Sequence, residues 1–162
     1  MMFSTVDLCE RYCDEIQVAE PLLQNYGGVV AFHGPITTID TFEDSALIRE
    51  VLESKGEGKV LVVDSGGSIL VSLLGKELAS LAAANGWSGI VIHGCVRNVA
   101  DLAHIPIGIR ALAPSPLAGQ SNGRGSRDAP VHFAGITFRP GHHLYADADG
   151  ILVAPRELLS ES

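Results

Sequence analysis

The stretch KVLVVDSGGSILVSLLGKELASLAAANGWSGIVI, from Lys59 to Ile92, contains the elements that decide the fold. Its apolar opening, VLVV, predicts a buried strand that ends on the carboxylate of Asp64. Gly75 then marks the entrance of an Ala-rich helix, and Asn85-Gly86 ends that helix. A second apolar strand runs from Gly89 to Ile92. This order of strand, helix and strand is typical of a βαβ unit, so we predict an α/β domain.

The residues before this stretch predict two further helices and one strand. A helix from Thr5 to Ile16 has a Ser4/Thr5 cap and apolar residues at helical spacing. The segment from Ile36 to Phe42 alternates as a strand does, and Glu43-Asp44-Ser45 is typical of a helix start. Four apolar residues at helical spacing follow this start, which indicates that the second helix packs on the core.

The residues after the stretch predict strands and turns. A strand is expected from Ile107 to Leu112, followed by a long loop from Ala113 to Arg127 that is rich in Pro, Gly, Ser and Asn. Short strands and a closing helix are then expected, at 131–133, 136–138, 144–146, 151–153 and, for the helix, 157–159. The sequence contains no repeat and no linker, so residues 1–162 are expected to form one domain.

Composition excludes several classes of function. The formal net charge of −8 argues against direct nucleic-acid binding, because phosphate contacts require clustered Lys and Arg. No apolar run approaches the length of a membrane span, and the first residues do not resemble a signal peptide. Cys9, Cys13 and Cys95 form no metal or disulfide pattern, which suits a reducing cytoplasm. We therefore expect a cytoplasmic protein.

Polar residues gather where the strand Gly89–Ile92 gives way to a turn. Arg97 can bind a carboxylate with two parallel hydrogen bonds, and the helix that begins near Gly75 offers unpaired N–H groups. Asn98 and Asp101 carry oxygen atoms that suit a hard divalent cation. Together these residues predict a site for a small anionic oxoacid on a metal. The alternative is that Arg97 and Asp101, four residues apart, form only a surface ion pair.

Several stretches along nearly the whole chain resemble one known family. They are Asp7-Leu8-Cys9, Asn25 to Gly28, Phe42-Glu43-Asp44, Val60 to Ser68, Gly94 to Arg97, Gly135 to Phe138, Tyr145 to Asp147, and Gly150-Ile151. On these motifs the chain resembles the RraA-like family, which joins the regulator of ribonuclease E activity A to the class II 4-hydroxy-4-methyl-2-oxoglutarate aldolases. The resemblance implies a swivelling β/β/α fold and a ring-shaped homotrimer, with a pair of trimers as the alternative and active sites at subunit boundaries.

The resemblance also implies how an oxoacid binds. Backbone amides of Gly75, Lys76, Glu77 and Leu78, with the Arg97 side chain, are expected to hold the carboxylate of the pyruvyl group.

Two acids of the family pattern are missing from this chain. The family has Asp at the position of Lys76, which lies 97 − 76 = 21 residues before Arg97, and a metal-binding Asp at the position of Asn98. Asp101 keeps an acid and is expected near the metal, outside its direct ligands. We therefore expect a weakened site for a divalent cation, Mg²⁺ or Mn²⁺, and this departure puts catalysis in doubt.

Two functions follow from the resemblance. The first is a metal-dependent lyase that cleaves 4-hydroxy-4-methyl-2-oxoglutarate and decarboxylates oxaloacetate through a pyruvate enolate, with no catalytic residue assigned. The second is a protein inhibitor of ribonuclease E that binds the basic, disordered C-terminal region of that enzyme. The acidic net charge favours the inhibitor, whereas Arg97, Asp101 and the 75–78 stretch favour the lyase. A site reused for another anion is the third possibility.

Overall fold

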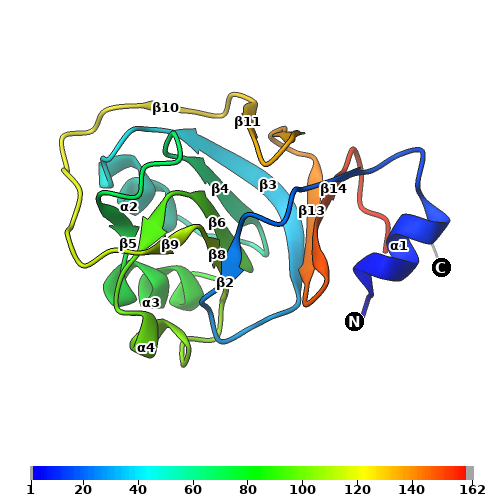
Figure 1. Ribbon diagram of the computed structural model, residues 1–162, viewed down its shortest axis with the longest axis horizontal. Coiled ribbons are helices and arrows are strands. Elements are labelled where there is room, and N and C mark those ends of the chain that lie inside the picture. The colour runs from blue at the N-terminus through cyan, green and yellow to red at the C-terminus, as the bar shows by residue number, and fades with distance from the viewer. Residues whose placement is uncertain (1, 160–162) are drawn as a thin grey trace.

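The computed structural model describes residues 2–159, and its centre is a twisted β-sheet (Figure 1). Four strands run parallel in the order β3 (Phe32–Asp40), β4 (Val60–Asp64), β6 (Gly89–His93) and β8 (Gly108–Ala111). Each of the first two steps between strands passes through a helix, α2 (Ala46–Leu52) and then α3 (Lys76–Ala84). The predicted α/β class and its βαβ unit are therefore confirmed.

Each of the last three parallel strands is continued by a short strand in a second sheet. This smaller parallel sheet has the order β5 (Ser72–Leu74), β7 (Cys95–Val96) and β9 (Ala113–Pro114). A single residue, Gly94, separates β6 from β7, and Leu112 separates β8 from β9. Arg97 and Asn98 directly follow β7, so they leave the smaller sheet and not the main one.

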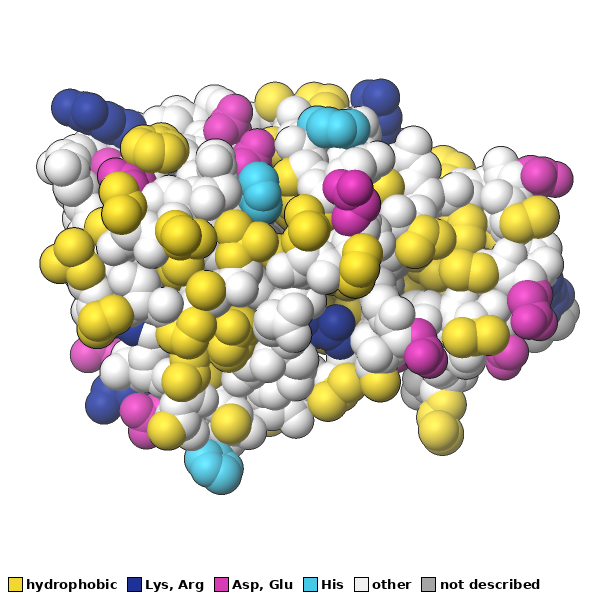
Figure 2. Space-filling model, in the orientation of Figure 1, with side chains coloured by type: hydrophobic (Ala, Val, Ile, Leu, Met, Phe, Trp, Pro, Cys, Tyr) yellow, Lys and Arg dark blue, Asp and Glu magenta, His cyan; other side chains and the backbone are white. Residues whose placement is uncertain are grey.

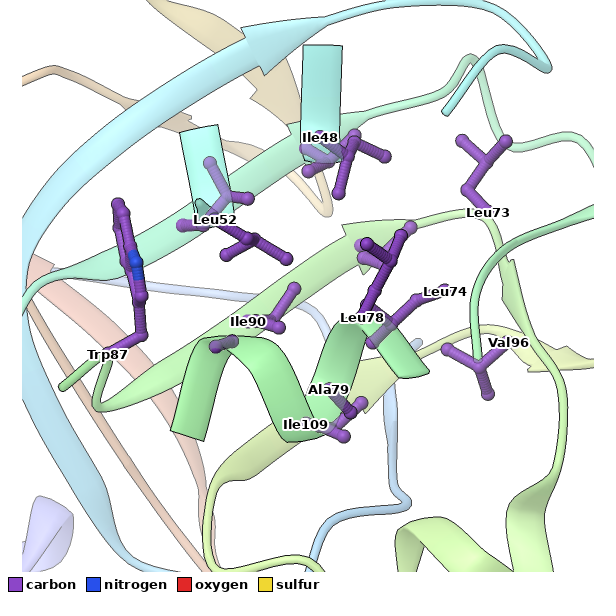
Figure 3. Close-up of a cluster of buried hydrophobic side chains, with 14 of the residues drawn as sticks. Ile48, Leu52, Leu73, Leu74, Leu78, Ala79, Trp87, Ile90, Val96 and Ile109 are labelled. Atoms are coloured by element: carbon purple, nitrogen blue, oxygen red, sulfur yellow. The ribbon is translucent and has the colours of Figure 1, made fainter. Parts of the chain in front are cut away.

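The core has two apolar layers because the central strands are buried on both faces. Leu61 and Val63 of β4 face α2 and α3, whereas Val60 and Val62 face the C-terminal strands. Figure 3 shows the first layer, in which side chains of α2 and α3 meet those of the sheet. Leu78 lies in this layer, so packing fixes the first turn of α3 next to β5.

The antiparallel part of the molecule is built on the long strand β3. Its first residues pair with β13 (His143–Asp147), and its last five pair with β4. β14 (Gly150–Ala154) pairs with β13 on one edge and with β1 (Gln17–Val18) on the other. The remaining elements are β2 (Gln24–Asn25), which pairs with β8, β10 (Ser126–Arg127), which pairs with β3, the hairpin β11 (Val131–Phe133) and β12 (Ile136–Phe138), α1 (Thr5–Arg11) and α4 (Val99–Leu102).

Two predicted elements differ from the structure by several residues at one end. The first helix ends at Arg11 and not at Ile16, because Asp14 and Glu15 would place negative charge at the negative end of the helix dipole. The strand predicted from Ile36 to Phe42 spans Phe32–Asp40, because its first residues find a partner in β13.

The closing helix at 157–159 is absent. The N–H groups of Leu158 and Leu159 instead donate to the buried hydroxyl of Tyr145, at 2.7 and 3.3 Å, which holds this segment in a turn. No helix within residues 2–159 is long and apolar enough to cross a lipid bilayer.

Candidate functional site

A cavity of about 90 Å³ lies where α3 begins beside β5 and the end of β7. Its lining brings together residues from α2, β5, α3, the turn after β7 and the long loop after β9. They are Ser45, Arg49, Ser72, Leu73, Gly75, Lys76, Glu77, Leu78, Arg97, Asn98, Ala118 and Gly119. Six of these residues are ones that the sequence places in the site.

Gly75 lies directly against the Arg97 side chain. A Cβ atom at Gly75 would stand 2.8 Å from Arg97 Nε and 2.8 Å from Asn98 Oδ1, closer than side chains approach. The Arg97 N–H donates to Leu74 O at 2.9 Å, which ties the two segments together. The guanidinium group therefore lies over the start of α3, beside N–H groups of the first turn that have no acceptor within the helix.

Asn98 connects the two segments a second time. Its Oδ1 atom accepts a hydrogen bond from the Lys76 N–H at 3.2 Å, so a side chain from another loop caps α3. Asn98 has a left-handed backbone, with φ 58° and ψ 42°, which Asn tolerates better than most residues. The amide oxygen that the sequence assigns to a metal thus points at the backbone of the helix.

Positive charge dominates the polar lining of the cavity. Of the residues that the structure describes, Arg49, Lys76 and Arg97 line it, and Glu77 is the one carboxylate among them. Within residues 2–159, none of the three cations makes an ion pair with an acid. The ion pair between Arg97 and Asp101 that we considered as an alternative is likewise absent from this part of the chain. Unpaired cations that converge on one cavity favour an anionic ligand.

The predicted loop from Ala113 to Arg127 is shorter in the structure, because β9 and β10 occupy its two ends. The remaining loop, between β9 and β10, forms another wall of the cavity through Ala118 and Gly119. Asp44, which is only 1% exposed, holds this loop in place. Its carboxylate accepts hydrogen bonds from the backbone N–H groups of Asn122 at 2.8 Å, Gly123 at 3.2 Å and Arg124 at 3.4 Å. It also accepts from Ala46 N–H at 3.0 Å, at the start of α2.

These contacts set the charge of Asp44. Burial alone would raise the pKa of its carboxyl group, but the four backbone donors outweigh burial and lower that pKa below its ordinary value. A fixed anion therefore joins the start of α2 to the loop. Ser45, Arg49, Ala118 and Gly119 owe their positions in the cavity to this connection.

The structure brings together most of the predicted site and separates one residue from it. Gly75, Lys76, Glu77, Leu78, Arg97 and Asn98 line one cavity. Asp101 is exposed on α4 and lies outside the lining. Sequence reasoning missed Ser45 and Arg49, although the capping stretch Glu43-Asp44-Ser45 marked the helix that carries both.

The residues of the cavity do not fit a divalent cation. Asn98 supplies a neutral oxygen that already accepts a hydrogen bond, and three cationic side chains share the lining. Within residues 2–159, no group of three or more His, Cys, Asp or Glu side chains is placed to hold a metal ion.

Comparisons with known proteins identify relatives of the whole chain. A family model described as "RraA-like: Aldolase/RraA" matches residues 5–153. A protein of Alkalilimnicola ehrlichii is 50% identical over 159 residues, which cover 98% of this chain and 99% of that protein. Its name is "Putative 4-hydroxy-4-methyl-2-oxoglutarate aldolase", and other bacterial relatives of similar identity share that name.

Two solved structures have the same fold. One, from Geobacillus kaustophilus, is described as an S-adenosylmethionine:2-dimethylmenaquinone methyltransferase; it has a TM-score of 0.96, 46% identity and 99% coverage of both chains. The other, from a Thermus species, is described as the RNA-processing inhibitor RraA; it has a TM-score of 0.93, 42% identity, and coverage of 96% of this chain and 94% of that one. The three descriptions name three different activities on one scaffold.

Proposed function

Because the chain belongs to the RraA-like family, we propose that it is a carbon–carbon lyase that releases pyruvate from small oxoacids. The proposed substrates are 4-hydroxy-4-methyl-2-oxoglutarate and oxaloacetate. The observation that carries the proposal is the convergence of Arg97, Lys76 and Arg49, unpaired with acids, on one cavity at the start of α3. The names of the relatives that share about half of its residues along the whole chain support the same reaction class.

The cavity suits the pyruvyl end of such a substrate. Arg97 would bind the 1-carboxylate through two parallel hydrogen bonds, and the N–H groups of Glu77 and Leu78 would complete its coordination. Gly75 leaves the space that the Arg97 side chain needs. With the carboxylate held at the start of α3, the 2-oxo group comes within the positive field of the cavity.

Positive charge near the 2-oxo oxygen is what the reaction requires. When the C3–C4 bond of oxaloacetate breaks, carbon dioxide leaves and the electron pair moves into a pyruvate enolate. The negative charge then rests on the 2-oxygen, and C3 takes a proton from water to give pyruvate. Aldol cleavage gives the same enolate after a base removes the C4 hydroxyl proton. Decarboxylation needs no such base and is the simpler activity to test.

The candidate cavity is too small for the cofactor of the methyltransferase described for one structural neighbour, and a larger cavity of about 340 Å³ lies elsewhere, beside α1 and β14. A volume of about 90 Å³ accommodates a molecule the size of pyruvate. Nucleoside cofactors such as S-adenosylmethionine need a pocket in the range of roughly 300–1,000 Å³ that is typical of drug-sized ligands.

Assembly into a homotrimer, or into a pair of trimers, belongs to the same proposal. Phe42, Ile69, Leu70 and Leu117 are all more than 60% exposed on the turns after β3, β4 and β9. Figure 2 shows hydrophobic side chains gathered over the end of the molecule that carries β5 and β9. Burial of such side chains against a second copy would remove them from water and give the neighbouring cavity another wall.

A ribonuclease E inhibitor is the second candidate. The net charge of −8 and the 42% identity to the RNA-processing inhibitor favour it. An acidic ring could bind a basic disordered segment at several points, with an affinity that falls as salt increases. A cytoplasmic location is part of both candidates.

Pyruvate release from oxaloacetate tests the lyase directly. We expect turnover above the spontaneous rate, measured by coupled oxidation of NADH, with Mg²⁺, with Mn²⁺ and with a chelator in parallel. A protein that is inactive toward both oxoacids in all three conditions, yet slows ribonuclease E at low salt, would replace the lyase with the inhibitor.

A further inference from the structure

The polar lining of the cavity is mainly positive, whereas the lining of a metal site is mainly negative. In the arrangement that the resemblance implies, two acids at positions 76 and 98 would offset the charge of a divalent cation, so that −2 + 2 = 0. Here Lys76 and Asn98 give +1 + 0 = +1 before any metal arrives. The cavity without metal therefore carries more positive charge than the implied cavity with metal. Arg49 and Arg97 add to this charge, and Glu77 offsets one unit of it.

The geometry also engages the oxygen that would be the remaining ligand. The Lys76 N–H holds Asn98 Oδ1 at 3.2 Å, and the Cβ that is missing from Gly75 leaves room for Arg97 beside that oxygen. A dication that reached Asn98 would approach the Arg97 guanidinium and the positive end of α3. Repulsion from these charges opposes its binding.

We propose that the Lys76 ammonium group takes the place of the divalent cation in this cavity. The protein then binds oxoacids, and dianions that resemble the enolate, without metal. Arg97 holds the 1-carboxylate, and Lys76 donates hydrogen bonds to the 2-oxygen as negative charge develops there. This inference rests on the proposed lyase function and names the residue that would stabilise its enolate.

Arg49 extends the inference to the second charge of the substrate. It lies on α2, in a different wall of the cavity from Arg97. Both proposed substrates are dicarboxylates, and cations on two walls suit an anion with a charge at each end. The bond changes are those already described for oxaloacetate, with Lys76 remaining protonated and unmodified throughout.

Binding of oxalate, a dianion of the shape of the pyruvate enolate, tests the inference without any reaction. We expect calorimetry to give the same oxalate affinity with a chelator as with Mn²⁺. Lys76→Met should weaken oxalate binding at least tenfold. Lys55→Met, which removes an exposed lysine outside the cavity, should leave oxalate affinity unchanged.

A variant that carries acids at both positions gives a second test of the inference. Lys76→Asp with Asn98→Asp restores the two acids, and oxalate should then bind only when Mn²⁺ is present. If oxalate binding by the unaltered protein disappears with the chelator, Lys76 does not replace the metal, and the inference is overturned whether or not lyase activity persists with Mn²⁺. If oxalate binds without metal but neither oxoacid is turned over, the cation role stands and the lyase proposal fails.

Discussion

Asp44 and Asn98 each fix one wall of the same cavity by accepting hydrogen bonds from a distant backbone segment, but they differ in every other respect. Asp44 is buried and charged, and it accepts from four N–H groups. Asn98 is exposed and neutral, and it accepts from one. The Asp44 wall is part of the fold, whereas the Asn98 wall can change its chemistry without disturbing the core.

The largest effect should come from Arg97, which belongs to the Asn98 wall. Arg97→Ala removes the proposed carboxylate partner and should cost about 2–4 kcal/mol of transition-state binding, or roughly 30- to 1,000-fold in kcat/KM for oxaloacetate. Its free energy of unfolding should stay nearly unchanged, because the side chain is exposed. Arg139→Ala, an exposed arginine outside the cavity, is the matched control. Unaltered turnover by Arg97→Ala would refute its role.

The Asp44 wall should behave in the opposite way. Asp44→Asn places an NH₂ group against buried backbone donors whichever way the amide turns, and should lower the free energy of unfolding by about 3 kcal/mol. Urea denaturation measures this loss, and Asp40→Asn at the exposed end of β3 is the control. A rise in KM should accompany the loss, because Ala118 and Gly119 are held less firmly. Equal stability of the two variants would show that the loop does not depend on the carboxylate.

These two expectations show how far the sequence determines the site. The motif order predicts the βαβ unit, the helix start at Gly75 and the turn that carries Arg97 and Asn98, because strand and helix patterns are local. The family resemblance is what adds Lys76, Glu77 and Leu78. Asp44 and Arg49 escape prediction because their roles depend on a loop about 80 residues away, and no local pattern records such a contact. The closing helix fails for the same reason, since the distant hydroxyl of Tyr145 accepts its N–H groups.

Low pH should destabilise the fold first through its antiparallel part, which lies outside the cavity. His143 is buried, its Nε2 lies 2.9 Å from His33 Nδ1, and burial and this neighbour lower the pKa of His143 to about 4. The unfolded chain takes up a proton near pH 6.5 that the folded chain refuses. Stability is therefore complete above pH 6.5 and falls by about 2–3 kcal/mol as the pH drops from 6.5 to 4.

His143→Gln should make the fall in this part of the pH profile smaller, and the rest belongs to His33, whose pKa is also lowered by burial. His104→Gln, at an exposed histidine, should leave the profile intact. Asp44 contributes on the more acidic side, because the pKa of its carboxyl group is lowered from 3.8 in the folded state. Its stabilisation is present above pH 3.8 and disappears as the pH falls through the lower, folded value. Urea midpoints measured from pH 7 to pH 2 would separate the two steps. A profile that stays flat down to pH 4 would contradict the assignment to His143.

The smallest effect should come from restoring the acid at position 98. Asn98→Asp keeps an oxygen that can accept from the Lys76 N–H and adds a negative charge at the positive end of α3. It should raise the free energy of unfolding by about 0.5 kcal/mol at low salt, and the gain should disappear at high salt. The same variant should bind oxalate less well in the presence of a chelator, because the new carboxylate offsets part of the positive charge.

A gain in stability together with a loss of anion binding would mean that Asp is the better residue for the start of the helix. The value of Asn98 would then lie in leaving the cavity positive. If stability and oxalate binding both decrease, the neutral amide fits the cap better than a carboxylate does. Asn98 would then contribute to the stability of the fold, as Asp44 does.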